Sequence, residues 1–111
     1  MWISDSYREK ADWLSTFADI KEVKFIKLLP DEEAKFEITY WDATDDSEYG
    51  RNDGLYSTTV NIPYELDWDY DEDNDEDYCI LSDVGLISLA DILTTEQQTY
   101  IYDAIESALG C

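Results

Sequence analysis

Apolar residues near the N-terminus recur at the spacing of an α-helix. Four of them are separated by four, three and four positions, which places them on one helix face. The apolar stripe consists of Tyr7, Ala11, Leu14 and Ala18, and Phe17 widens it. Ser4 or Asp5 can cap the first turn with a side-chain oxygen. We therefore expect a helix that begins at this cap and runs to about Asp19.

The next two segments have β character. Residues 22–29 (EVKFIKLL) are rich in strand-forming side chains, and residues 30–33 (PDEE) are typical of a turn. Residues 34–41 then alternate, so that Phe36 and Ile38 share one face of a strand with Tyr40. This pattern predicts a hairpin whose second strand is half-buried.

A long alternating segment follows a polar loop. Residues 44–54 (TDDSEYGRNDG) are polar and contain two glycines, which is typical of a loop. From residue 55 to residue 66, strand-forming side chains recur with period two, and this predicts a third strand. They are Tyr56, Thr58, Val60, Ile62 and Tyr64. Residues 78–81 (YCIL) predict a short fourth strand or the edge of the core.

The C-terminal segment is helical in pattern. Residues 86–93 predict a helical turn or a short helix, and residues 95–98 (TEQQ) fit a capping box. The box opens a helix that runs to about Leu109, with Gly110 as its stop. The fold class expected is α+β. Residues 1–111 form a single acidic domain in which an N-terminal and a C-terminal helix pack on an antiparallel sheet of three to four strands.

Charge narrows the range of functions. The 111 residues include 28 Asp and Glu, 7 Lys and Arg and no His, so the formal net charge is −21. The absence of histidine excludes Ser-His and Cys-His catalytic pairs and zinc sites with His ligands. A surface with this much negative charge repels nucleic acid and anionic lipid. We therefore expect neither nucleic acid nor a membrane as a direct ligand. Disorder is not expected, because 44% of the residues are hydrophobic.

The negative charge is concentrated in the later part of the chain. Residues 1–30 contain five acids and five bases, whereas no base follows Arg51. The densest segment is residues 65–77, called here the acidic run, which has nine acids in thirteen positions. If the run continues the preceding strand, its alternate carboxylates line one face at a spacing of about 6.6–6.8 Å. Successive phosphates of a DNA strand are roughly 7 Å apart in space, so the row would imitate one phosphate backbone.

We expect the acidic run to bind a basic partner, with help from a second group of acids on a neighbouring loop. Leu66, Trp68 and Tyr70 are expected to face away from the carboxylates and to anchor the row. The alternative is that the run is a solvated segment that only aids solubility. The candidate residues in the run are Glu65, Asp67, Asp69, Asp71, Glu72, Asp73, Asp75, Glu76 and Asp77, with Trp68 and Tyr70. The second group is Asp42, Asp45, Asp46, Glu48 and Asp53.

Calcium binding and catalysis are not expected. A calcium loop needs Gly at its sixth position and Glu at its twelfth, and registers that start at Asp67, Asp69 or Asp71 supply neither. The sequence contains no phosphate-binding glycine loop and no nucleophile elbow, so we expect no enzyme, no cofactor and no metal. Residues 1–5 lack the features of a signal peptide, and Cys79 and Cys111 are expected to be reduced thiols in the cytoplasm, Cys79 within the core.

These features together predict an inhibitor. In charge and expected architecture the chain resembles the DNA-mimic proteins that phages and mobile elements use against restriction enzymes, CRISPR effectors or repair nucleases, although no motif of a particular family occurs. The expected partner is a basic, nucleic-acid-binding protein in a bacterium or a phage-infected cell: a nuclease, a restriction or CRISPR effector, or a toxin. One alternative is an immunity protein or antitoxin that neutralises a single basic nuclease. Another is an acidic chaperone or scaffold for a basic client, and homodimerisation stays open.

Overall fold

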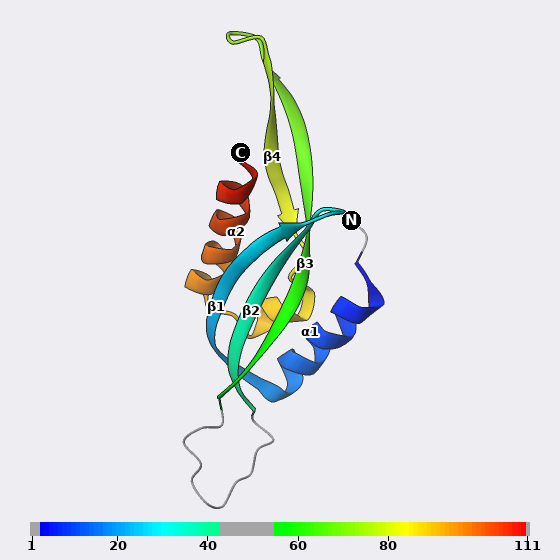
Figure 1. The fold of residues 1–111 in the computed structure, drawn as a ribbon, viewed down its shortest axis with the longest axis vertical. Coiled ribbons are helices and arrows are strands. Elements are labelled where there is room, and N and C mark those ends of the chain that lie inside the picture. Colours follow the sequence, from blue (N-terminus) through cyan, green and yellow to red (C-terminus); the bar gives the residue numbers. More distant parts are fainter. Residues whose placement is uncertain (1–2, 43–54, 111) are drawn as a thin grey trace, which may run out of the picture.

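The computed structural model describes residues 3–42 and 55–110. Two helices, four strands and one 3₁₀ helix follow one another along this part of the chain (Figure 1). They are α1 (Asp5–Phe17), β1 (Ala18–Leu29), β2 (Glu33–Asp42), β3 (Leu55–Asp71), β4 (Glu76–Val84), η1 (Ile87–Asp91) and α2 (Thr95–Leu109). The expected α+β fold with an antiparallel sheet and two terminal helices is confirmed.

The four strands form an antiparallel sheet in the order β1-β2-β3-β4. The 17 residues of β3 serve two different partners. Its first half pairs with β2, from Leu55 opposite Trp41 to Pro63 opposite Glu33. Its second half pairs only with β4, from Tyr64 opposite Val84 to Asp71 opposite Glu76. The sheet is therefore three strands wide at one end and two strands wide at the other.

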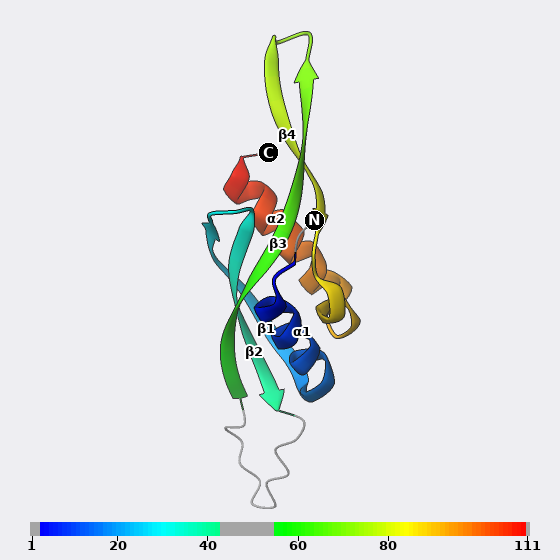
Figure 2. The same ribbon diagram turned by 90° about the vertical axis from the view of Figure 1, so that its right-hand side faces the viewer.

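Both helices contribute to one hydrophobic core against the wide end of the sheet (Figure 2). The alternation predicted for β2 is confirmed, because Phe36 and Ile38 are completely buried and Tyr40 is nearly so. Tyr7 of α1 is buried beside them, and its hydroxyl donates a hydrogen bond of 3.1 Å to the carbonyl oxygen of Leu86. The other fully buried large side chains are Leu14, Ile62, Leu89, Ile101 and Ile105.

Side chains of the helices reach the outer edges of the wide part of the sheet. On the β3 edge, Lys10 of α1 donates a hydrogen bond of 2.8 Å from Nζ to the carbonyl oxygen of Thr59. On the β1 edge, the backbone N–H of Phe25 donates a hydrogen bond of 2.8 Å to the hydroxyl of Tyr100 in α2. Exposed strand edges are templates for unwanted pairing. A helix side chain therefore occupies one backbone hydrogen-bonding group on each edge of the wide part of the sheet.

Element boundaries differ from the sequence expectations by a few residues. Helix α1 begins as expected, with the Ser4 side chain accepting a hydrogen bond from the N–H of Tyr7, but it ends at Phe17 and the chain passes directly into β1. The capping box of α2 is formed by Thr94 and Gln97, one residue before the expected position. The same sequence pattern fits both registers, so the sequence could not separate them.

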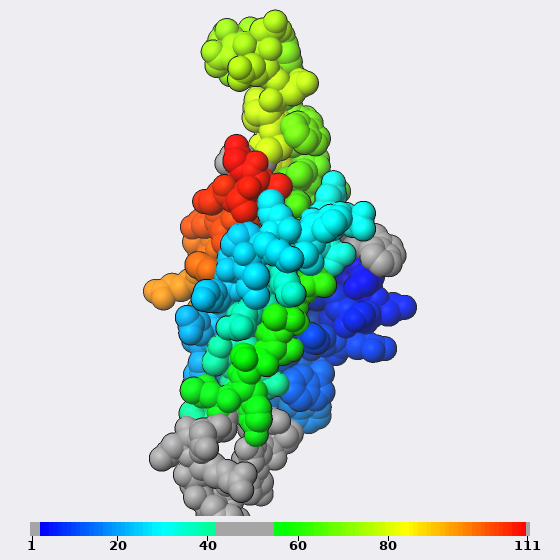
Figure 3. Space-filling view, viewed as in Figure 1, coloured from blue at the N-terminus to red at the C-terminus, as the bar shows by residue number. Residues whose placement is uncertain are grey.

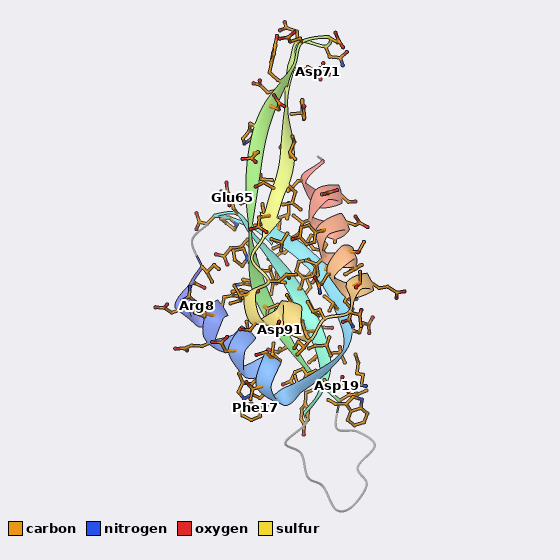
Figure 4. The ribbon with its side chains drawn as sticks, turned by 180° about the vertical axis from the view of Figure 1, so that it is seen from behind. Arg8, Phe17, Asp19, Glu65, Asp71 and Asp91 are labelled. Atoms are coloured by element: carbon orange, nitrogen blue, oxygen red, sulfur yellow. The ribbon has the colours of Figure 1, made fainter. Side chains whose placement is uncertain are left out.

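The narrow end of the sheet projects from the rest of the molecule (Figure 3). We call residues 65–83 the distal hairpin and the remaining described residues the body. The outer part of the hairpin extends β3 and β4 beyond both helices, while the C-terminal end of α2 lies beside its base (Figure 1). The molecule is 64 Å long but only 25 by 21 Å across. Glu65 lies at the base of the hairpin and Asp71 near its tip (Figure 4). The expected short fourth strand is thus longer than residues 78–81 and includes the last two acids of the run.

Candidate partner-binding site

The distal hairpin carries ten acids and no base. They belong to both strands and to the turn between them, residues 72–75. Within residues 3–42 and 55–110, the only ion pair lies in the body, where Lys21 Nζ is 2.9 Å from Asp19 Oδ2. No lysine or arginine of the described chain therefore neutralises a carboxylate of the hairpin.

The strand register places the acids of β3 on one face of the hairpin, called here the acidic face. Residues 65, 67, 69 and 71 alternate with residues that point to the other side. Directly opposite residues of antiparallel strands share a face, so β4 adds Glu76 opposite Asp71 and Asp83 opposite Glu65. The four carboxylates of β3 span roughly 20 Å, three intervals of about 6.7 Å. Residues 65–71 thus form the extended strand that the phosphate-like row requires, along this half of the acidic run.

The row is shorter than the full alternation of the sequence suggested. The chain turns at residues 72–75, where Asp75 adopts a left-handed backbone conformation with φ of 55°. Beyond the turn the alternation changes face, because Asp77 lies opposite Tyr70. Asp77 thus points to the opposite side from the row, and Asp73 and Asp75 lie in the turn itself.

Two pairs of acids face each other across the strands of the hairpin. Glu65 lies opposite Asp83 at the base, and Asp71 lies opposite Glu76 at the tip. Like charges directly opposite each other destabilise a strand pair. The hairpin therefore retains charge at a cost to its own stability, and a solubilising function alone does not require such facing pairs.

Neutral donors hold two of the row's carboxylates in place. Asp69 accepts a hydrogen bond of 2.8 Å from the N–H of Tyr70 and one of 3.2 Å from the hydroxyl of Tyr78. Asp71 accepts one of 2.8 Å from the side-chain amide of Asn74 and one of 3.0 Å from the N–H of Asp73. These bonds, that from Asn74 foremost, lower the pKa of Asp71 below its ordinary value. The carboxylates are oriented while their negative charge stays uncompensated.

The hydroxyls of the two hairpin tyrosines donate hydrogen bonds to carboxylates, and this favours their protonated form. The hydroxyl of Tyr70 donates a hydrogen bond to Asp75, and that of Tyr78 donates to Asp69. Each bond to a carboxylate favours the protonated phenol, so the pKa of each tyrosine is raised above its ordinary value. Tyr78 lies on the acidic face opposite Asp69, with Ile80 next to it opposite Asp67.

The second face of the hairpin, called here the aromatic face, carries the residues expected to anchor the row. Leu66 is half-buried against the edge of the core, together with Leu81 opposite it. Trp68 is 69% exposed and Tyr70 is 49% exposed. The expectation that both aromatic side chains anchor the row is therefore wrong, because the core ends at the level of Leu66. Only Leu66 has that role.

Asp42, the one member of the second group of expected acids that the structure describes, does not join the hairpin. Asp42 is the last residue of β2, next to the start of β3, whereas Asp71 is at the other end of the same 17-residue strand. At about 3.4 Å per residue, these ends are roughly 54 Å apart. One contiguous surface cannot include both. Asp45, Asp46, Glu48 and Asp53 lie outside the described residues.

Three residues of the acidic face were not predicted from the sequence. Tyr78 and Ile80 lie on it because β4 pairs with the acidic half of β3, and Asp83 lies on it because β4 continues beyond residue 81. Strict alternation would place Asp83 on the other face from Tyr78 and Ile80. Only the register shift between Glu65 and Leu66 brings it opposite Glu65, so the sequence contains no signal for it. The turn did have a signal, since residues 73–75 (DND) are the side chains that favour turns.

Cys79 differs from the expectation of a reduced core thiol. It is disulfide-bonded and only half-buried, on the aromatic face opposite Trp68. The only other cysteine of the sequence is Cys111, which lies outside the described residues.

Two cavities of the described structure lie along the body, one of them reaching the base of the hairpin. One of about 160 Å³ lies between the turn at residues 31–33 and Glu65, and one of about 340 Å³ lies between α1 and the sheet, next to Lys10 and Lys35. Among the described residues, no group of three or more acids or cysteines is arranged to hold a metal ion. The hairpin surface, rather than a cavity, is therefore the site that the geometry singles out.

Comparison with known proteins adds no further constraint on function. No family model matches the sequence, and neither a curated protein nor a solved structure matches the chain. Neither helix within the described ranges has the length and apolarity needed to cross a membrane.

Proposed function

We propose that this protein is an acidic inhibitor that binds and blocks the basic, nucleic-acid-binding surface of another protein. The observation that supports this most is the row of four carboxylates on a projecting hairpin, without a compensating cation. A duplex-binding groove is lined with Lys and Arg that accept phosphates at a similar spacing. The row would occupy that groove in place of a DNA strand.

The energetic properties of the hairpin fit such a partner. Oriented carboxylates require little rearrangement on binding, which lowers the entropic cost of association. In the free protein, the two acids within each facing pair repel each other. Cations of the partner would relieve that repulsion. A field of one sign also accelerates association with an oppositely charged protein, in a manner that salt suppresses.

A nuclease-protection assay tests the proposal. The probes are three purified nucleases of unrelated fold: a restriction endonuclease, a guide-loaded CRISPR nuclease and a repair nuclease, each with labelled duplex DNA. The wild-type protein should inhibit cleavage by at least one of them. The triple variant D67N/D69N/D71N should inhibit it about a hundredfold more weakly, if each lost charge contact contributes about 1 kcal/mol.

A control variant separates site from net charge. D91N/E96Q/D103N removes three exposed acids of the body and changes the net charge by the same amount. It should inhibit like the wild-type protein. If the hairpin variant inhibits as well as the control, or if the wild-type protein protects DNA from none of the nucleases, the proposal is wrong.

The exposed Trp68 favours a second candidate, an immunity protein or antitoxin for one nuclease toxin. A dedicated complex depends on a few buried aromatic side chains more than on total charge. W68A would then abolish inhibition of a single nuclease and D67N/D69N/D71N would weaken it less. A general mimic shows the reverse order.

The proposal includes a location in the cytoplasm of a bacterium or a phage-infected cell, where the target nucleases act. Disulfides do not persist in that reducing compartment. Inhibition should therefore be the same with and without dithiothreitol. Loss of inhibition on reduction would show that the Cys79 disulfide is needed, and it would contradict the cytoplasmic location.

A further inference from the structure

The aromatic face of the distal hairpin has a feature that charge mimicry alone leaves unexplained. Trp68 is the most exposed of the exposed large hydrophobic residues in the described structure, and Tyr70 is half-exposed beside it on the same strand. Exposing these rings to water is unfavourable. Solubility does not require them, and the core does not reach them.

The aromatic face also carries one acid, Asp77. Asp77 lies directly opposite Tyr70, and Cys79 lies opposite Trp68, so Asp77 is the diagonal neighbour of Trp68 across the strands. Diagonal neighbours lie about 7–8 Å apart, within reach of a long side chain that touches both. The hydroxyl of Tyr70 is held by Asp75, and this bond restrains the ring at the edge of the group.

An indole ring with a carboxylate at this distance matches one side chain in particular. The planar guanidinium of arginine stacks on an aromatic ring and at the same time donates hydrogen bonds to a carboxylate. The compact, strongly hydrated ammonium of lysine does not combine the two contacts as well. The chemistry of the face therefore selects arginine over lysine.

We propose that Trp68 and Asp77, with Tyr70 beside them, form a binding site for an arginine side chain of the partner. The site rests on the proposed function in taking the partner to be a basic protein, and it adds a constraint on that partner's shape. Cations meet the hairpin on both faces, so the partner receives it in a cleft rather than on a flat surface. Carboxylates supply charge on one face, and guanidinium recognition supplies selectivity on the other.

Peptide binding tests the site without the natural target. The probes are fluorescein-labelled nona-arginine and nona-lysine, and their affinities are measured by fluorescence anisotropy at 150 mM salt. The wild-type protein should bind nona-arginine about two- to fivefold more tightly than nona-lysine, the size of a surface cation–π contact. W68A should remove this preference, W68F should retain most of it, and D77N should reduce it.

Two controls locate the preference. Y78A removes a half-exposed aromatic side chain from the acidic face of the same hairpin, and the preference should remain. D67N/D69N/D71N should weaken the binding of both peptides by a similar factor and leave their ratio unchanged. Melting curves of W68A verify its fold, which should be intact because the ring lies outside the core.

Equal affinities of the wild-type protein for the two peptides would overturn the inference, as would an arginine preference that survives in W68A or disappears in Y78A. These results are separate from the nuclease assay. The arginine site can fail while the acidic row still inhibits a nuclease. Conversely, the preference for arginine can be found while inhibition is absent, which would refute the proposed function alone.

Discussion

The body and the distal hairpin share one strand but are built on opposite physical principles. In the body, β3 contributes Val60 and Ile62 to a closed core, and helices reach both outer edges of the sheet. In the hairpin, the same strand presents carboxylates on one side and exposed aromatic rings on the other. Stability is therefore concentrated at one end of the molecule, and charge is free to accumulate at the other.

The two regions also differ in how their charges are balanced. The described residues of the body carry fourteen acids and six bases, whereas the hairpin carries ten acids and no base. Bases therefore offset part of the negative charge of the body, whereas the hairpin has no base that offsets its own. A long strand anchored by half its length lets the fold hold a segment that could not be stable alone, since an isolated hairpin is marginal at best in water.

The comparison predicts a large loss of stability when an aromatic side chain is removed from the body and almost none when one is removed from the hairpin. F36A removes a fully buried ring of the body and should lower the free energy of unfolding by about 3–5 kcal/mol. W68A removes an exposed ring of the hairpin and should change it by less than about 0.5 kcal/mol. Urea denaturation measures both. Comparable losses in the two variants would mean that the hairpin is part of the core.

Alkaline pH should weaken the body through Tyr7. Burial raises the pKa of this tyrosine above its ordinary value of 10.0. A group whose pKa is raised on folding stabilises the protein fully below its unfolded pKa, and this contribution is lost as pH rises above about 10. The melting temperature should therefore fall steeply above pH 10.

The variant Y7F isolates this contribution. It should lose about 1–2 kcal/mol at pH 7, because the carbonyl of Leu86 loses its hydrogen bond. Its melting temperature should then fall less than that of the wild-type protein between pH 9 and pH 11. Parallel pH profiles of the two proteins would contradict the assignment to Tyr7.

Salt should act on the hairpin, with a smaller effect. Raising the salt concentration from 10 to 150 mM shortens the screening length to about 8 Å and weakens the repulsion within the facing pairs. The melting temperature should rise by about 2–4 °C, roughly 0.5 kcal/mol. E76Q/D83N removes one acid from each pair and should reduce the rise. A flat or falling response of the wild-type protein would show that repulsion is unimportant.

Much of the body could be predicted from local patterns. The period-two alternation through Phe36 and Ile38 identified a half-buried strand, and the stripe of Tyr7 and Leu14 identified the first helix. These patterns succeed because burial of one face dictates both the period and the residue type. Boundaries were less certain, since capping patterns at Thr94 and Thr95 are equivalent in sequence.

The hairpin could be predicted only in part. Alternation indicated that acids share a face, but it could not show that the core ends at Leu66 and leaves Trp68 exposed. That limit depends on where the helices lie, which is a tertiary property. The distance between Asp42 and Asp71 was inaccessible for the same reason, because it depends on the pairing of β3 with different strands along its length.

The central claim is that the body provides stability and the hairpin provides binding, and one shortened variant tests it directly. Leu66 and Leu81 face each other across the strands, so residues 67–80 can be replaced by Asn-Gly, a two-residue turn that suits an antiparallel pair. This change also removes Cys79, so the full-length variant C79S is the matched control.

The measurement is a thermal melt of the shortened variant and of C79S, with nuclease inhibition assayed on the same samples. The shortened variant should unfold cooperatively at a temperature close to that of C79S, or above it at low salt because eight acids are gone. It should also no longer inhibit the nuclease that C79S inhibits. Retained inhibition, or a body that no longer folds, would contradict the division between a stabilising body and a binding hairpin.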